Sequence, residues 1–170
     1  MQSPGGYGTL VFEVMDLLGI LECAAYAVMP CILGMLWELA VGVNGLLAAL
    51  VTFLTLGGWY WAGFRYSKRV KNPAAALLLG NSVGILSFAV YLWQEYGAAV
   101  KTMWLQALSQ KFAAPLTMIT VRIVMRFSPV VDGVTQVSNT ALQAVGLALM
   151  AVLFAVAYFS ARQREKLLKK

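Results

Sequence analysis

The sequence contains no histidine and only two cysteines. Without histidine, the chain cannot form a histidine-ligated haem site, a His-containing metal site, or a Ser-His or Cys-His nucleophile pair. Cys23 and Cys31 lie in one apolar run, where a helix would separate them by about 12 Å along its axis, too far for a disulfide. We therefore interpret both as small buried residues, and we expect no metal and no other cofactor.

Charged residues are also scarce. Only 12% of the 170 residues are charged and 61% are hydrophobic, whereas soluble domains carry about 25% charged residues. The apolar residues form long uninterrupted runs, and a run of about 18 or more is typical of a helix that crosses a bilayer. Because a crossing backbone must satisfy its own hydrogen bonds and the runs lack β alternation, an all-α integral membrane protein is predicted.

Positive charge is absent from the first part of the chain, since no lysine or arginine precedes Arg65. The basic residues then cluster directly after apolar runs, where they orient a membrane protein and contact anionic lipid headgroups. The net charge of +6 therefore predicts the lipid bilayer as a partner, and not nucleic acid. The predicted cytoplasmic anchor consists of Arg65, Lys68, Arg69, Lys71, Arg162 and Arg164.

Motifs of enzymes are missing as well. The sequence has no glycine-rich phosphate loop, no cluster of metal ligands and no paired carboxylates with a nearby base. Serine and threonine are present, but no residue is placed to activate them, so we expect a protein that is not an enzyme. The N-terminus lacks a basic n-region and a clean cleavage site, so we expect it to remain on the protein.

Four apolar runs have the length of about 20 residues that a crossing helix needs. They cover residues 17–39, 43–64, 74–93 and 140–161 of one membrane domain that comprises residues 1–170. Asn44-Gly45 is a turn signal and predicts a tight hairpin between the first two runs. Pro73 suits the first turn of the third helix. Residues 94–139 form a much longer connection.

The aromatic residues Trp59, Tyr60 and Trp61 directly precede the first basic cluster. Tryptophan and tyrosine prefer the headgroup level, and lysine and arginine accumulate in short cytoplasmic loops. The second span therefore leaves the membrane on the cytoplasmic side. Two further spans return the basic C-terminal tail to that side, which predicts cytoplasmic N- and C-termini.

The long connection carries a polar stripe in residues 102–127. Polar or small residues recur there at helical spacing, and Pro115 is expected to break or kink the helix. Two interpretations remain open: amphipathic helices that lie on the outer interface, or a re-entrant segment with a polar stripe along a water path. The interfacial arrangement is favoured and completes the predicted fold class, a four-helix membrane bundle with interfacial amphipathic helices.

The fourth span has two distinct faces. One face is polar and carries Asp132, Gln136, Asn139 and Gln143. The other carries small residues, namely Ala141, Ala144, Ala148, Ala151 and Ala155. Small residues let helix backbones approach closely in lipid, so this alanine face is predicted to pack against a helix, either within the bundle or between copies. In the third span Gly80 and Gly84, extended by Ser87, form a GxxxG pattern that predicts a second helix contact.

Two polar residues lie within predicted spans. Asn81 is an amide in hydrocarbon and is expected to find a partner. Glu22 is consistent with an ion or proton site. Alternatively the first span begins after Glu22, and Leu10 to Leu21, with Glu13 and Asp16, form an amphipathic start at the interface.

These features favour a non-enzymatic membrane protein that acts by helix–helix association, as a homo-oligomer or as a small subunit of a larger complex. Its partners would then be other membrane protein chains. The alternative is a small channel or transporter for an ion or small solute, built around Glu22, Asn81, Asp132 and the glutamine and threonine stripes. In a transporter the polar residues are expected to converge on one cavity.

Overall fold

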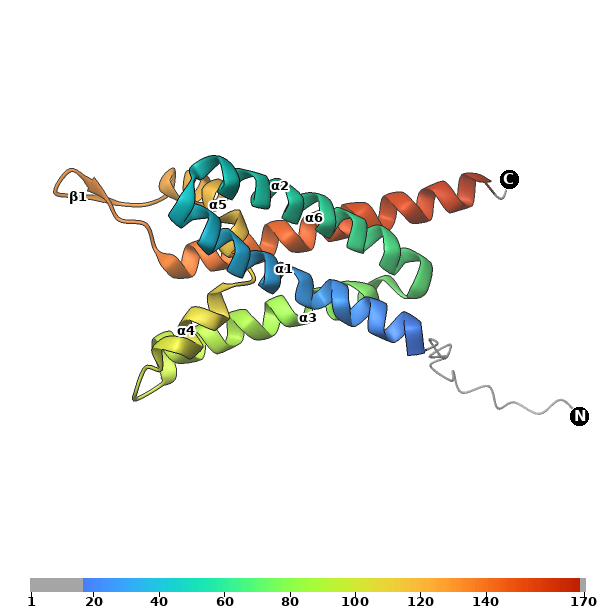
Figure 1. Ribbon diagram of the computed structural model, residues 1–170, viewed down its shortest axis with the longest axis horizontal. Helices are drawn as coiled ribbons and strands as arrows, with labels where there is room; N and C mark the ends of the chain where they lie inside the picture. Colours follow the sequence, from blue (N-terminus) through green and yellow to red (C-terminus); the bar gives the residue numbers. More distant parts are fainter. Residues whose placement is uncertain (1–16, 169–170) are drawn as a thin grey trace, which may run out of the picture.

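Four long helices make up most of the molecule (Figure 1). The computed structural model describes residues 17–168, with side chains from residue 19, so the expectations for Glu13 and Asp16 lie outside the described residues. The long helices are α1 (Leu17–Val43), α2 (Gly45–Arg69), α3 (Pro73–Leu92) and α6 (Asn139–Leu168). All four are long and apolar enough to cross a membrane. This confirms the prediction of an all-α bundle with four candidate membrane helices.

The starts of α2 and α3 follow from asparagine caps. The Asn44 Oδ1 accepts a hydrogen bond from the Leu46 N–H at 2.8 Å, and the Asn72 Oδ1 accepts one from the Ala74 N–H at 3.0 Å. Both caps satisfy N–H groups that the first helical turn leaves unpaired. Pro73 occupies the first position of α3, where its missing N–H costs nothing.

A series of short elements connects α3 with α6. The π-helical turn η1 (Trp93–Gly97) is followed by α4 (Met103–Gln110), the 3-10 turn η2 (Ala114–Leu116) and α5 (Thr117–Met125). Two short antiparallel strands come next, β1 (Val130–Val131) and β2 (Val134–Thr135). Figure 1 shows this hairpin extending beyond the helices at the end of the bundle farthest from the C-terminus.

The bundle has two chemically different ends. The basic end holds the start of α1, the α2–α3 turn and the C-terminal part of α6, and the opposite end holds the α1–α2 turn and the hairpin (Figure 1). At the basic end the Tyr158 hydroxyl donates to the carbonyl oxygens of Val70 at 2.8 Å and Lys71 at 3.1 Å. The Arg162 guanidinium donates to the same Lys71 carbonyl at 2.7 Å. These bonds fix the α2–α3 turn against α6.

Aromatic side chains form the centre of the core. Trp59, Tyr66, Phe112 and Phe154 are each at most 2% exposed. The rings of Trp59 and Phe112 meet edge to face with centroids 5.6 Å apart, and those of Tyr66 and Phe154 do so at 5.1 Å. Such T-shaped pairs stabilise beyond the burial of their area. The Trp59 indole N–H also donates to the Met150 carbonyl at 2.9 Å, which ties α2 to α6.

Two predictions about the connection need correction. Residues Phe112 to Leu116 are buried inside the bundle, so an interfacial position for the whole of residues 102–127 is wrong. Asp132 is exposed at the hairpin turn, far from any polar stripe along α6. Asp132 and Gly133 have φ values of +52° and +77°, the left-handed pair that a two-residue hairpin turn requires.

Candidate functional site

The connection between α3 and α6 folds back into the bundle and breaks there. Helix α4 ends at Gln110, the 3-10 turn η2 occupies Ala114 to Leu116, and α5 continues from Thr117. We call residues 111–116 the helix break. Broken helices at membrane depth are tolerated only where protein or a cavity surrounds the backbone. The burial of this segment meets that condition.

Three glycines, one from each of three long helices, make room for the helix break. A Cβ at Gly34 of α1 would collide with the carbonyl oxygen of Lys111, and one at Gly84 of α3 would collide with the Phe112 ring. A Cβ at Gly146 of α6 would come within 2.9 Å of the Ala113 Cβ. The glycines therefore serve close approach here, with no demand on backbone conformation.

Helix α2 supplies the fourth side of this enclosure through a hydrogen bond. The Thr52 hydroxyl donates to the Pro115 carbonyl at 2.6 Å, across 63 positions in sequence. Thr52 is 4% exposed and also donates to the Ala48 carbonyl at 3.0 Å. This hydroxyl gives the buried Pro115 carbonyl a hydrogen bond from another helix, and buried carbonyls require such partners.

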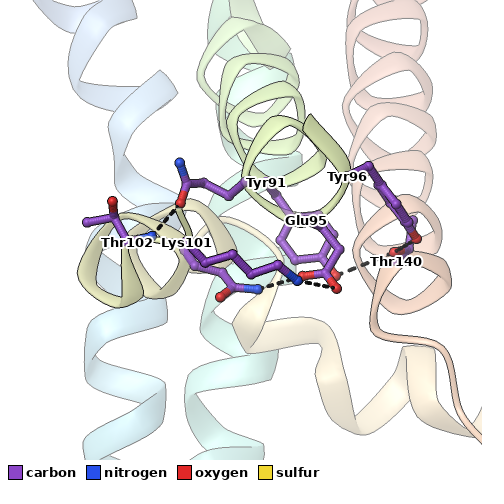
Figure 2. A network of polar contacts seen from close by, with 8 residues as sticks. Tyr91, Glu95, Tyr96, Lys101, Thr102 and Thr140 are labelled. Atoms are coloured by element: carbon purple, nitrogen blue, oxygen red, sulfur yellow. Dashed lines mark hydrogen bonds and ion pairs between the residues drawn. The ribbon is translucent and has the colours of Figure 1, made fainter. Parts of the chain in front are cut away.

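A polar network fixes the start of α4 (Figure 2). The Gln94 Oε1 accepts from the Thr102 N–H at 2.8 Å. The Glu95 carboxylate pairs with Lys101 at 3.2 Å and accepts from the Gln106 amide at 2.8 Å. Figure 2 also shows Tyr96 reaching Thr140 at the start of α6, a hydroxyl contact of 2.8 Å.

The π-helical turn makes this network geometrically feasible. The Ala98 N–H donates to the Trp93 carbonyl at 2.8 Å, a bond that spans five positions. The wide turn carries Gln94 and Glu95 toward α4, and π-turns of this kind occur frequently at functional sites. The network thus sets where the segment with the helix break begins.

A polar pocket of about 170 Å³ lies beside the helix break, toward the opposite end of the bundle. Its lining comes from α1, α4, η2, α5 and α6, namely Trp37, Glu38, Gln110, Ala113, Ala114, Thr117, Asn139, Leu142 and Gln143. Glu38 and Asn139 are exposed and form its rim, whereas Gln143 is 8% exposed. We call this cavity the polar pocket.

Glu38, which lines the polar pocket, takes part in an ion pair. The Lys111 ammonium, on a side chain that is 12% exposed, contacts the Glu38 carboxylate. Charges inside a membrane span are costly and mark functional sites or structural pairs. The pair joins α1 to the helix break and leaves the pocket without net charge from these two residues.

A second cavity is larger than the polar pocket, and its lining is almost entirely apolar. It is an apolar groove of about 530 Å³ between α3 and α6, which we call the α3/α6 groove. Its lining consists of Leu77, Leu78, Asn81, Ile85, Phe88, Ala144, Leu147, Ala148, Ala151, Val152 and Ala155. Asn81 is the polar member, 3% exposed, and its amide donates to the Leu77 carbonyl at 2.9 Å. Its Oδ1 is buried and has no hydrogen-bond partner.

The alanine face of α6 lines this groove instead of packing inside the bundle. Ala144 and Ala148 are exposed, while Ala141, Ala151 and Ala155 are half-buried. Ala144 and Ala148 therefore do not pack inside this chain, and the other part of the prediction, packing between copies, stays a prediction for them. The reason is that the buried face of α6 carries larger groups, including Met150 and Phe154 at 0% exposure, and these turn toward α2.

The GxxxG pattern of α3 accommodates aromatic rings. A Cβ at Gly80 would collide with the Phe154 ring, and Gly84 faces Phe112 as described. Ser87 is half-buried beyond them. The two glycines thus receive large side chains from α6 and from the helix break, and they do not bring two helix backbones into direct contact.

Glu22 lies at the basic end. Its Oε1 accepts from the Arg65 Nε at 2.6 Å and its Oε2 from Arg69 at 3.1 Å. Helix α1 begins at Leu17 and runs through Glu22 without interruption, and the part of the alternative that concerns residues 10–16 lies outside the described residues. Both carboxylate oxygens are engaged, so Glu22 ties α1 to α2. Lys68 and Lys71 are exposed nearby, and Arg164 is exposed on the last turns of α6.

The predicted polar residues therefore occupy separate places. Glu22 lies at the basic end, Asn81 in the α3/α6 groove, and Asp132 and Gln136 on the exposed hairpin segment. Only Asn139 and Gln143 share a cavity, the polar pocket. The cavities found in the described chain thus do not gather this set at one site.

Sequence reasoning missed the residues that build the enclosure: Gly34, Trp37, Glu38, Thr52, Lys111 and Gly146. A signal existed for two of them. Glu38 and Lys111 are opposite charges within otherwise apolar segments, and such charges usually pair. For Thr52 and the two glycines no local pattern identifies the contact, because the partner lies far away in sequence.

The described residues contain no group of three or more His, Cys, Asp or Glu side chains that could hold a metal ion. Comparisons of the chain with protein-family models, with curated proteins and with solved structures found no match. The two cavities and the charged residues at the basic end are thus the features of the described chain that bear on function.

Proposed function

We propose that this chain is a non-enzymatic membrane protein that acts by helix–helix association, and that the α3/α6 groove binds a second copy of the chain. The observation that carries the proposal is an open apolar groove with an unpartnered, buried amide oxygen at Asn81. Apolar lipid chains cannot donate a hydrogen bond to that oxygen. A protein partner can.

The shape of the groove supports a helix as its occupant. Ala144, Ala148, Ala151 and Ala155 follow one another at steps of four, three and four along α6, the spacing of a left-handed helix crossing. Small side chains allow an incoming backbone to approach closely, and close packing drives association in lipid, where no hydrophobic effect acts between helices.

The chemistry of Asn81 favours an identical partner. A carboxamide has an acceptor oxygen and two N–H donors, and here one donor is used by Leu77. Across a two-fold axis, each Asn81 can donate its remaining N–H and accept at Oδ1 once its side chain, buried in the single chain, turns toward the groove, so the residue complements itself. Two-fold interfaces place the same patch on both subunits. A different membrane chain would have to provide both groups at the same spot.

Association is tested by filling the groove. Ala148→Leu is expected to abolish the dimer in lipid nanodiscs, measured by native mass spectrometry, because the larger side chain occupies the space of the incoming helix. Ala24→Leu, at an exposed position of α1, is the matched control and should leave the dimer intact. A wild-type chain that remains monomeric at every lipid ratio, or an Ala148→Leu dimer, would contradict the proposal. The proposal would also be contradicted if the protein bound an unrelated membrane chain and still bound it after Asn81→Leu.

The basic end is proposed to face the cytoplasm, with both chain termini on that side. The support is the clustering of Arg65, Lys68, Arg69 and Arg162 at one end of the bundle, since lysine and arginine accumulate in cytoplasmic loops. Single cysteines at Asn72 and Val100, both exposed, separate the two ends in a chain with Cys23 and Cys31 replaced by alanine. An impermeant thiol reagent applied to intact cells should label position 100 and spare position 72. The reverse pattern would invert the topology.

A channel or transporter is the second candidate, and the helix break favours it. Transporters often bind solutes where helices are interrupted, and here an ion pair and several amides lie beside the interruption. The aromatic core formed by Trp59, Tyr66, Phe112 and Phe154 lies between this pocket and the basic end, which favours association instead. Solute flux into liposomes that contain the purified chain tests transport. Flux that is present in the unmodified chain and lost in Lys111→Met would favour transport over association.

A further inference from the structure

Two residues that line the polar pocket carry polar groups with no protein partner, one of them buried and the other open to the cavity. The Trp37 indole N–H is buried and has no acceptor. Gln143 is 8% exposed, and within residues 19–168 the structure gives its side-chain amide no hydrogen bond. Both residues line the pocket. A buried indole N–H without an acceptor costs free energy, and an open amide beside it can be satisfied by water or by a ligand.

The unpartnered groups define the chemistry that fits between them. Trp37 offers one donor, and the Gln143 amide offers a donor pair and an acceptor. A carbonyl oxygen has two lone pairs, so one such oxygen can accept from both residues. An N–H group next to that carbonyl can donate to the Gln143 oxygen. A primary carboxamide or a urea group carries both functions side by side.

Charge and size narrow the ligand further. The Lys111 ammonium and the Glu38 carboxylate neutralise each other, so an ion would enter without a compensating charge and pay its full desolvation cost. The volume of about 170 Å³ corresponds to roughly five or six waters at their liquid volume. The ligand is therefore compact and uncharged.

We infer that the polar pocket is a binding site for one small neutral molecule with a primary carboxamide or urea group. The carbonyl is held by Trp37 and Gln143, the N–H returns to the Gln143 oxygen, and Thr117 and Asn139 provide further polar contacts at the wall and rim. The site is formed by one chain, and it is independent of association at the α3/α6 groove.

The test uses the full chain in lipid nanodiscs, with the five tryptophan indole N–H signals followed by ¹H–¹⁵N NMR. Titration with acetamide is expected to shift the Trp37 signal, assigned by Trp37→Phe, in a saturable way. N,N-dimethylacetamide keeps the carbonyl and lacks the N–H donors, so it should leave that signal in place. Urea, which carries the same group, should compete with acetamide.

Two variants separate binding from folding. Gln143→Met keeps most of the side-chain volume and removes the amide, so it should weaken acetamide binding roughly tenfold or more, because two hydrogen bonds to the ligand are lost. Gln136→Met, on the exposed segment after the hairpin, is the matched control and should bind as the unmodified chain does. Unchanged signals from the other tryptophans report that each variant is folded.

A linear shift of equal size at all five tryptophans would mean that the pocket holds only water, and it would overturn the inference. So would equal binding of acetamide and N,N-dimethylacetamide, or wild-type affinity in Gln143→Met. Since none of these measurements depends on oligomeric state, a failure here leaves the proposed association untouched, and a monomeric chain leaves this site untouched.

Discussion

Helix α6 packs against α2 and against α3 in two very different ways. On the α2 side, a Cβ at Gly63 would lie 2.6 Å from the Phe154 carbonyl and 2.9 Å from the Ala157 Cβ, so the two backbones are in close contact. On the α3 side, much of the boundary is the open α3/α6 groove with exposed alanines. Both surfaces are rich in small residues.

The difference shows that small side chains permit close approach but do not cause it. The contact between Gly63 and Ala157 is buried within the packed core, where Trp59, Met150 and Phe154 are each 0% exposed. Ala144 and Ala148 are exposed and are not covered in this way. The α3 glycines Gly80 and Gly84 receive the rings of Phe154 and Phe112. An alanine stripe in a membrane helix therefore indicates an available surface, and its occupant must be sought separately.

The difference between the packed α2 side and the open α3 side of α6 is tested most strongly by placing the same larger side chain on each side. Ala157→Leu should destabilise the chain by about 3 kcal/mol or more, because Ala157 is 0% exposed and a packed core resists extra methylenes. Ala148→Leu adds the same atoms at an exposed site and should leave the stability of the monomer within about 0.5 kcal/mol. Unfolding of detergent-solubilised monomers measures both. Equal losses would mean that the groove is closed in the isolated chain.

A smaller effect is expected where α1 meets the helix break. Gly34→Ala places a Cβ against the Lys111 carbonyl, and a backbone group cannot rotate aside, so we expect a loss of about 2 kcal/mol. Gly42→Ala in the same helix meets no atom within 4 Å. It should be neutral or stabilise by up to about 1 kcal/mol, since alanine is the better helix former. Thermal unfolding in one detergent compares the pair, and a neutral Gly34→Ala would show that the segment is not held against α1.

The smallest effect concerns the hydroxyl that α2 donates to the helix break. Thr52→Val keeps the shape and leaves the buried Pro115 carbonyl without its 2.6 Å partner, which should cost about 1–2 kcal/mol. The Thr55 hydroxyl donates to the Val51 carbonyl of its own helix at 2.8 Å, so Thr55→Val should stay within about 0.5 kcal/mol. Protection of the Leu116 and Thr117 amides in hydrogen exchange should fall only in Thr52→Val. Equal protection in both variants would contradict a role for this bond.

The sequence predicted the bundle better than its interior. Each expected span falls within or near one long helix, with α2 and α6 continuing to Arg69 and Leu168, because hydropathy and length suffice to mark such runs. Charged residues at helix ends are tolerated beyond the hydrocarbon, which explains why these helices extend past the apolar runs.

The buried position of the helix break could not be predicted from the local sequence, and the reason is physical. Its periodicity shows an amphipathic segment with a proline, and that pattern fits an interfacial helix as well as a re-entrant one. The choice depends on Gly34, Thr52 and Gly146, which lie 30 or more positions away in sequence and have no periodicity in common with it. Asp132 is a different case, since Asp-Gly flanked by valines is a hairpin signal that a helical spacing pattern obscured.

The enclosure of the helix break imposes an order of events during synthesis. Three of its walls, α1, α2 and α3, precede it in the chain, but Gly146 follows Ala113 by 33 positions. At about 5–20 residues per second, the ribosome needs roughly 2–7 s to add that stretch. Until α6 is made, the helix break has only three of its four walls, although Thr52 of α2 can already donate to the Pro115 carbonyl. Helix α6 is therefore the element that completes the enclosure of the helix break.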